Sequence, residues 1–355
     1  MNSNSIGKAL TFTCFGESHG YVIGSILDGC PAGLPLSEED IQPELDKRRP
    51  GTGIISTSRK ERDKVEIVSG VFEGFTTGAP ICMIIKNLDV DSEPYEEIRF
   101  TPRPGHADYT AYIRYGGFND YRGGGRFSGR ITATYVMAGA VAKKLLKIFN
   151  VEILAHTIQI GSIILEEEVS LEDIRRNVYQ NKVRCADPKI GNLMEKEIHE
   201  TSKKGDSLGG IIEGIALNVP PGIGDPIFDS LDSDLAKMLF NIPAVKGVEF
   251  GAGFKSASLR GSQNNDQFYI KNGKIVTSTN NSGGIVGGLS TGMPIVVKVA
   301  FKPTPSIKIK QKIFEFWLKN NFYLNRNINF KYNDKARDWF AFCVPSSFNR
   351  MGSFT

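Results

Sequence analysis

The sequence predicts an α+β fold built as one intertwined domain, for three reasons. Short segments rich in Val, Ile, Phe and Thr and bounded by glycine are typical of strands. Segments with the three- and four-residue apolar spacing of helices lie between them. No internal repeat appears in the 355 residues, and no Pro- or Ser-rich linker divides them. Strands and helices are therefore expected to share one core.

The strand predictions rest on β-branched and aromatic residues between glycines. The predicted strands span residues 10–15, 21–27, 64–68, 81–85 and 294–301.

The first helix is predicted at 37–50, where Ser37 and the acidic residues after it resemble a capping box and Pro50 ends the pattern. The longest is predicted at 129–149, where apolar residues recur at helical spacing and three small residues near the middle permit close packing. Three more helices, each beginning near Ser, Asn or Asp, are predicted at about 170–179, 192–204 and 230–240.

Composition predicts a soluble protein in a reducing compartment. Apolar residues make up 40% of the chain, and no apolar run approaches the roughly 20 residues of a membrane span. Residues 1–7 lack the basic and apolar regions of a secretory signal, so the expected location is the cytoplasm. The cysteines are odd in number and lack metal-ligand spacing, which predicts reduced thiols, no disulfide and no metal site. They are Cys14, Cys30, Cys82, Cys185 and Cys343.

Basic residues cluster at 47–50, 58–62 and 121–130, although the net charge is only +4. The intervening stretches are glycine-rich and lack a sustained basic face with stacking aromatics, so a small polyanion is a better ligand than nucleic acid. A phosphorylated metabolite is the predicted ligand class. Neither nucleic acid nor a membrane is an expected partner.

Two of the four histidines lie in glycine-flanked loops with charged neighbours: His19 in FGESHG and His106 in RPGHAD. A loop histidine in such surroundings can exchange protons near neutral pH, although a surface or packing role is the alternative. His156, in an apolar strand-like run, and His199, in a charged helix, are expected to be structural.

Two glycine-rich stretches are candidate anion sites. YRGGGRFSGR at 121–130 brings arginines and backbone N–H groups together directly before the longest helix. SGGIVGG at 282–288, followed by FKPTPSI at 301–307, offers amides, a lysine and hydroxyls that could grip a planar cofactor with a phosphate tail. The alternatives are a flexible loop with solvated arginines and an ordinary ordered loop.

Together and in order, several long motifs resemble the chorismate synthase family over residues 5–307. They are FGESHG, LDKRRPGT, RPGHADYT, DYRGGGRFSGR, IPAVKGVEFG, RGSQNND, NSGGIVGG and FKPTPS. The resemblance implies an α+β fold in which antiparallel sheets are layered with helices around a central core, assembled as a homotetramer.

The activity that the resemblance implies is the anti-1,4-elimination of phosphate from 5-enolpyruvylshikimate 3-phosphate to give chorismate, in the shikimate pathway. Reduced FMN is required without net redox, and the flavin supplies the electron density for the step. Whether NADPH reduces the flavin on this chain stays open. The alternative is a flavin-binding homologue or NAD(P)H:FMN reductase that lacks lyase activity because its C-terminus is altered.

Matching motifs also imply site residues. His106 would protonate or hold the reduced flavin and His19 would assist the leaving phosphate, and both roles need a pKa near neutrality. Ser18 and Ser128 match serines that relay protons or order water. The substrate's phosphate and carboxylates would be bound by Arg48, Arg103 and Arg130. FMN would be bound, partly across a subunit boundary, by Arg126, Phe127, Ser128, Pro243, Ala244, Gly287, Lys302, Pro303, Thr304, Pro305 and Ser306.

The sequence departs from the family in two places. Many relatives carry an arginine at the position aligned with Ile54, where Arg59 or Lys60 could substitute. From about Lys308 the expected GRHDP-type motif, proline-arginine turn and terminal helix are not recognisable, and residues 308–355 hold both tryptophans, eight of the 22 phenylalanines and one glycine. This change predicts a chorismate synthase-like domain at 1–307 and an atypical, frameshifted segment at 308–355.

Overall fold

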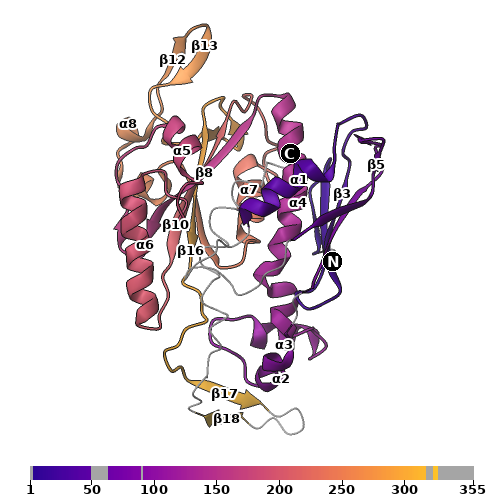
Figure 1. Cartoon of the computed structure of the whole chain (residues 1–355). Helices are drawn as coiled ribbons and strands as arrows, with labels where there is room; N and C mark the ends of the chain where they lie inside the picture. The colour runs from indigo at the N-terminus through magenta and orange to yellow at the C-terminus, as the bar shows by residue number, and fades with distance from the viewer. Residues whose placement is uncertain (1–2, 49–62, 89–90, 317–322, 327–355) are drawn as a thin grey trace.

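Two five-stranded antiparallel sheets lie on either side of a helical layer in the computed structural model of the chain (Figure 1). The structure describes residues 3–48, 63–88, 91–316 and 323–326. Within that part of the chain, no helix combines the length and the apolarity needed to cross a membrane. The predicted α+β class is confirmed.

The first sheet has the strand order β1-β2-β3-β7-β4. Its strands are β1 (Ser5–Ile6), β2 (Thr11–Gly16), β3 (Val22–Asp28), β7 (Ile81–Lys86) and β4 (Val65–Ser69). Four of them are the strands predicted between residues 10 and 85, with ends that differ by one residue at most. Burial alternates along β2 and β7, so one face of the sheet is directed at the core.

The second sheet has the order β11-β16-β10-β8-β9. Its strands are β11 (Val245–Phe250), β16 (Ile295–Phe301), β10 (Gly210–Leu217), β8 (Glu152–Ile160) and β9 (Ile163–Ile164). The predicted strand at 294–301 is confirmed as β16. Four short hairpins complete the β-structure: β5 (Val71–Phe72) with β6 (Phe75–Thr76), β12 (Phe268–Lys271) with β13 (Lys274–Thr277), β14 (Ile285–Val286) with β15 (Leu289–Ser290), and β17 (Ile313–Phe316) with β18 (Tyr323–Arg326).

Helix α4 (Thr132–Ile148) is the centre of the fold. It packs on β2, β3 and β7 of the first sheet, on helix α1 (Glu38–Arg48) and on β8 of the second sheet. Val136, Met137 and Val141 are fully buried in the cluster that joins α4 to α1 and the first sheet. Both helices were predicted, and the small residues of α4 allow the close approach of its neighbours.

The remaining helices cover the second sheet and close one end of α4 (Figure 1). Helix α7 (Leu231–Phe240) packs on β11, while α5 (Leu171–Asn177) and α6 (Pro188–Lys203) pack on β8. Helix α6 begins four residues before its predicted start, because Asp187 caps it and Pro188 fits its first turn. The short elements are α2 (Glu93–Ile98), α3 (Asp108–Tyr115), α8 (Gly261–Asn264), η1 (Arg122–Phe127), η2 (Gly129–Ile131) and η3 (Gly253–Ser258).

Replacement of Met137 by alanine should lower the free energy of unfolding by about 2–5 kcal/mol, because it empties a fully buried site between α4 and the first sheet. Urea denaturation followed by circular dichroism measures the change. Ile148→Ala, at the end of the same helix where the side chain is 63% exposed, is the matched control and should cost far less. Equal losses in the two variants would contradict the central position of Met137.

Candidate active site

The glycine turn η1 packs against the FGESHG loop. Gly123 has a φ of 60°, and a Cβ atom there would lie 2.3 Å from Cδ2 of His19 and 2.8 Å from Oγ of Ser18. The backbone N–H of Ser18 donates to the carbonyl oxygen of Gly125 at 3.2 Å. Only glycine permits this approach, so the sequence GGG brings the first predicted histidine to the start of α4.

His19 is held by helix α2. Its Nδ1 lies 2.9 Å from Oγ of Ser92, and its ring meets the edge of Tyr95 with 5.2 Å between ring centroids. The guanidinium carbon of Arg103 lies 5.7 Å from the centroid of the same tyrosine ring. Tyr95 therefore lies between His19 and the RPGHAD loop, a role that no motif indicated.

Ser18 and Ser128 form a buried hydroxyl pair. Oγ of Ser128 donates to Oγ of Ser18 at 3.1 Å and accepts from the backbone N–H of Arg130 at 3.3 Å. Ser128 is thus the N-cap of η2, which leads directly into α4. The hydroxyl that the family motif singles out also begins the longest helix.

Arg48 and Arg130 share one carboxylate. Arg48 Nη1 donates to Oδ2 of Asp63 at 3.2 Å, and Arg130 Nη1 donates to Oδ1 of the same residue. The two arginines are each 5% exposed and Asp63 is 6% exposed. The sequence indicated the arginines but not Asp63, because a single aspartate ahead of a strand carries no motif.

The RPGHAD loop contains a bidentate ion pair and makes a hydrogen bond to another segment. Arg103 Nε and Nη2 donate to the two oxygens of Asp108 at 2.8 and 2.9 Å. Burial acts to raise the pKa of Asp108, but the hydrogen bonds and charge of Arg103 outweigh it and leave that pKa lowered. Nε2 of His106 lies 3.0 Å from Oγ of Ser306, so the loop meets the FKPTPS segment.

Burial and nearby positive charges favour the neutral form of the His106 imidazole, because they lower its pKa. Burial, followed by the positive charge of Arg103, lowers its pKa to about 3, although Asp108 acts in the opposite direction. The sequence-based expectation of a pKa near neutrality does not hold for the chain alone. The lowered pKa of His106 results from the loss of water around the ring and from the nearby cations.

The FKPTPS segment lies against the same loop. Lys302 Nζ donates to the carbonyl of Gly105 at 2.7 Å, and the backbone N–H of Lys302 donates to the carbonyl of Ala244 at 2.9 Å. Burial and the charge of Lys246 lower the pKa of Lys302. Lys246 lies at a bulge of β11, where the register with β16 shifts. It stands in the IPAVKGVEFG motif, yet the sequence analysis did not select it.

These contacts bring together most of the predicted cofactor residues. Lys302, Pro305 and Ser306 contact the RPGHAD loop directly. The other residues of this group lie next to them in the chain or behind them: Ala244, which bonds Lys302, with its neighbour Pro243, and Pro303 and Thr304. Phe127 is 47% exposed beside Tyr115 of α3, with 6.4 Å between the ring centroids. The predicted flavin loop and the predicted proton-transfer histidine therefore form one surface.

Two predicted cofactor residues lie elsewhere. Arg126 is directed at the first sheet, where Nη1 donates to the carbonyl of Gly16 at 3.2 Å and Nη2 donates to Oδ1 of Asn4 at 2.7 Å. Gly287 lies in the β14–β15 turn, whose next residue, Gly288, packs on Ser230 at the start of α7. Ala244 follows the other end of that helix, which is about 15 Å long at 1.5 Å per residue.

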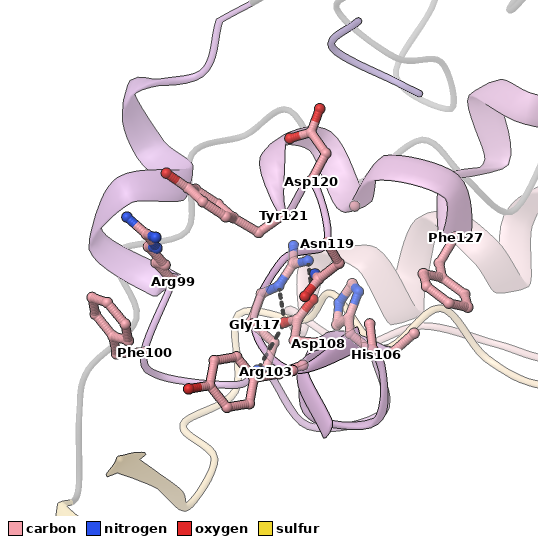
Figure 2. A pocket seen from close by; sticks show the side chains of 15 residues that line it. Arg99, Phe100, Arg103, His106, Asp108, Gly117, Asn119, Asp120, Tyr121 and Phe127 are labelled. Atoms are coloured by element: carbon pink, nitrogen blue, oxygen red, sulfur yellow. Dashed lines mark hydrogen bonds and ion pairs between the residues drawn. The ribbon is translucent and has the colours of Figure 1, made fainter. Parts of the chain in front are cut away.

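A cavity of about 220 Å³ joins the RPGHAD loop, α3 and η1. Figure 2 shows His106 beside the Arg103–Asp108 pair, with Phe127 on one side and Arg99 and Tyr121 on the other. The cavity is lined by Arg99, Phe100, Arg103, His106, Ala107, Asp108, Ala111, Tyr112, Gly116, Gly117, Asn119, Asp120, Tyr121, Gly124 and Phe127. It combines aromatic rings with charged groups, as ligand sites do.

The expected structural histidines lie outside this region. His156 is buried in β8 and its Nε2 lies 3.3 Å from Oε1 of Glu213 on β10, while His199 is exposed on α6. Cys14, Cys30, Cys82 and Cys185 are free thiols. The positions Ile54, Arg59, Lys60 and Cys343 lie outside the described residues.

Comparison with known proteins shows the family of the chain. The sequence model of the chorismate synthase family matches residues 10–327. The chain is 53% identical over 321 residues to the chorismate synthase of Korarchaeum cryptofilum, covering 90% of this chain and 89% of that protein. It is 52% identical over 310 residues to the chorismate synthase of Methanothermobacter thermautotrophicus, covering 87% and 82%.

A solved structure described as a crystal structure of chorismate synthase has the same fold. It superposes with a TM-score of 0.71 at 36% sequence identity, over 84% of this chain and 87% of that chain. The sequence match spans most of the chain and includes the loops that carry His19, His106 and the glycine turn. The chain therefore belongs to the chorismate synthase family of lyases.

Proposed function

We propose that the chain eliminates phosphate from 5-enolpyruvylshikimate 3-phosphate to give chorismate, with reduced FMN as cofactor, in the shikimate pathway. The observation that carries the proposal is the position of η1 between the two histidine loops. Gly123 contacts His19, while Gly124 and Phe127 line the same cavity as His106. One end of α4 thus unites two candidate proton-transfer groups with arginines suited to a phosphorylated substrate.

The residues present fit FMN. Lys302 and Lys246 are close enough for the charge of one to lower the pKa of the other, so an anionic phosphate placed there would relieve their repulsion. The hydroxyl of Ser306 adds a donor, and the exposed ring of Phe127 offers an apolar surface to a flat ring system. Bound FMN, once reduced, would supply the electron density that lets the allylic phosphate leave.

We assign roles to the chain's own groups on this basis. His106, whose Nε2 contacts Ser306, would donate a hydrogen bond or a proton from its ring nitrogen to the reduced flavin. His19, whose Nδ1 faces Ser92, would assist the leaving phosphate through its second nitrogen. Ser18 and Ser128 would order a water or relay a proton within their hydroxyl pair.

The substrate anions would be met by guanidinium groups that carboxylates already hold in place. Arg48 and Arg130 are fixed on Asp63, and Arg103 on Asp108. A guanidinium group that a carboxylate already orients keeps its positive charge at a fixed position, where it can attract a phosphate or a carboxylate. A trianionic substrate suits three such groups.

We also propose a cytoplasmic homotetramer that takes only small-molecule ligands. The cavity of about 220 Å³ is smaller than the roughly 300–1,000 Å³ of ligand pockets. Gly287 and Arg126, which match family FMN positions, lie away from it. A neighbouring subunit would supply those contacts and complete the site.

Anaerobic mixing of the full chain with dithionite-reduced FMN and 5-enolpyruvylshikimate 3-phosphate should release phosphate together with chorismate absorbance. No phosphate should appear when flavin is omitted, because the step needs its electrons. Phosphate release without flavin would contradict the proposal. FMN binding without any release would instead favour the flavin-binding or NAD(P)H:FMN reductase alternative.

The depressed pKa of His106 predicts a pH-dependent loss of stability. The unfolded chain binds a proton at the ordinary pKa of 6.5, and the folded chain does so only near pH 3, so stability is lost as the pH falls through this window. Between pH 6.5 and 5 the parent chain should lose up to about 2 kcal/mol more than His106→Gln. Urea denaturation at several pH values tests this, with exposed His199→Gln as control. Parallel pH profiles for the parent and His106→Gln would refute it.

We propose further that residues 1–307 form the chorismate synthase-like domain and that a change of reading frame altered the segment 308–355. The composition changes at about Lys308. The family match continues to residue 327, so the prediction that no residue after 307 matches the family was wrong for 308–327. Resequencing the gene should reveal one added or missing base after about codon 308 whose correction restores a GRHDP-like motif. A clean read without such a frame would rule this out.

A further inference from the structure

Asp63 links three segments that are distant in the sequence. It precedes β4, Arg48 ends α1, and Arg130 lies in η2 before α4. One carboxylate oxygen accepts from Arg48 at 3.2 Å and the other accepts from Arg130. Because all three side chains are at least nine-tenths buried, water screens these charges little.

The backbone of Asp63 is itself clamped. Gln42 of α1 donates from Nε2 to the carbonyl of Asp63 at 3.3 Å and accepts at Oε1 from the N–H of Val65 at 3.1 Å. Asp63 has a φ of 47°, a left-handed conformation that aspartate tolerates better than most residues. Helix α1 thus fixes both the backbone and, through Arg48, the carboxylate.

Each arginine is also tied on its other side. Arg48 Nη2 donates to the carbonyl of Gly129 at 2.9 Å, and Arg130 Nε donates to Oδ1 of Asn87 at 3.0 Å. Two guanidinium groups brought this close repel each other unless an anion lies between them. The carboxylate of Asp63 is that anion, and its width sets the separation of the pair.

We propose that Asp63 is a positioning residue that holds Arg48 and Arg130 in the arrangement that binds the anionic groups of the substrate. The proposal rests on the proposed function, in which these arginines meet the phosphate and carboxylates. Asp63 does not touch the substrate in this account. It acts by presenting two guanidinium groups at a fixed spacing, so the substrate does not have to order them when it binds.

Replacement of Asp63 by asparagine tests the proposal. The amide keeps the size of the side chain but loses its charge. Its NH₂ group cannot accept from one of the two guanidinium groups, so Arg48 and Arg130 should move apart. The KM for 5-enolpyruvylshikimate 3-phosphate with reduced FMN should rise roughly ten- to hundredfold while kcat falls by a smaller factor. Calorimetric titration of the full chain with the same substrate should give a matching rise in Kd.

Glu44 provides a matched control. Its Oε1 accepts from Lys47 at 2.8 Å and from Lys143 at 3.0 Å, so it is also a largely buried carboxylate between two cations. It joins α1 to α4 one helical turn before Arg48, through lysines instead of the arginine pair. Glu44→Gln should lower the melting temperature, as Asp63→Asn does, yet leave KM and Kd within about twofold. Asp63→Glu, which keeps the charge on a longer side chain, should bind with intermediate affinity and serves as the test if Asp63→Asn does not fold.

An unchanged or lowered Kd in Asp63→Asn would overturn the proposal, since a lowered value means that the carboxylate competes with the substrate. Equal rises in Asp63→Asn and Glu44→Gln would also overturn it, because the effect would then be one of general stability. These outcomes apply when the parent chain binds and converts the substrate. A parent chain that does neither refutes the proposed function itself.

Discussion

The candidate site depends on a run of left-handed backbone that only glycine adopts readily. Gly123–Gly125 have φ values of 60°, 80° and 53°, and a Cβ atom on the last of them would lie 2.0 Å from the carbonyl oxygen of Asp120. This tight turn lets the backbone contact His19 and accept a hydrogen bond from Ser18. The chain then reaches Ser128, which caps η2 and starts α4. One local constraint therefore couples the site to the central helix of the fold.

Local patterns predicted β2, β3, β4 and β7 of the first sheet, and also α1 and α4, because each signal lies within the segment itself. The glycine turn and the Ser128 cap likewise stand in one motif, so the site's position at the start of α4 could be inferred from the sequence. Strands β10 and β11 were not predicted, because Gly210–Leu217 contains two glycines and Val245–Phe250 contains a bulge. Their pairing with β16 is a long-range property.

The electrostatics of the site could not be predicted in the same way. The sequence separates Asp63 from Arg48 by 15 positions and from Arg130 by 67, so only the packing of α1, β4 and η2 joins them. The pKa of His106 depends on burial and on cations from another segment, among them Lys302. A motif identifies which histidine is a candidate for catalysis, whereas the surroundings in the folded chain set the charge of that histidine.

The neutral state of His106 has a consequence for the proposed chemistry. Burial and nearby cations lower the pKa of His106 in the chain alone. An anion bound beside the imidazole would offset these positive charges and would form an ion pair with the protonated ring. By linkage, a ligand that raises the pKa of His106 binds more tightly to the protonated form by the same factor. The histidine would therefore be charged mainly when an anionic ligand is present. In the proposed function, proton transfer at His106 would be tied to ligand binding rather than to bulk pH alone.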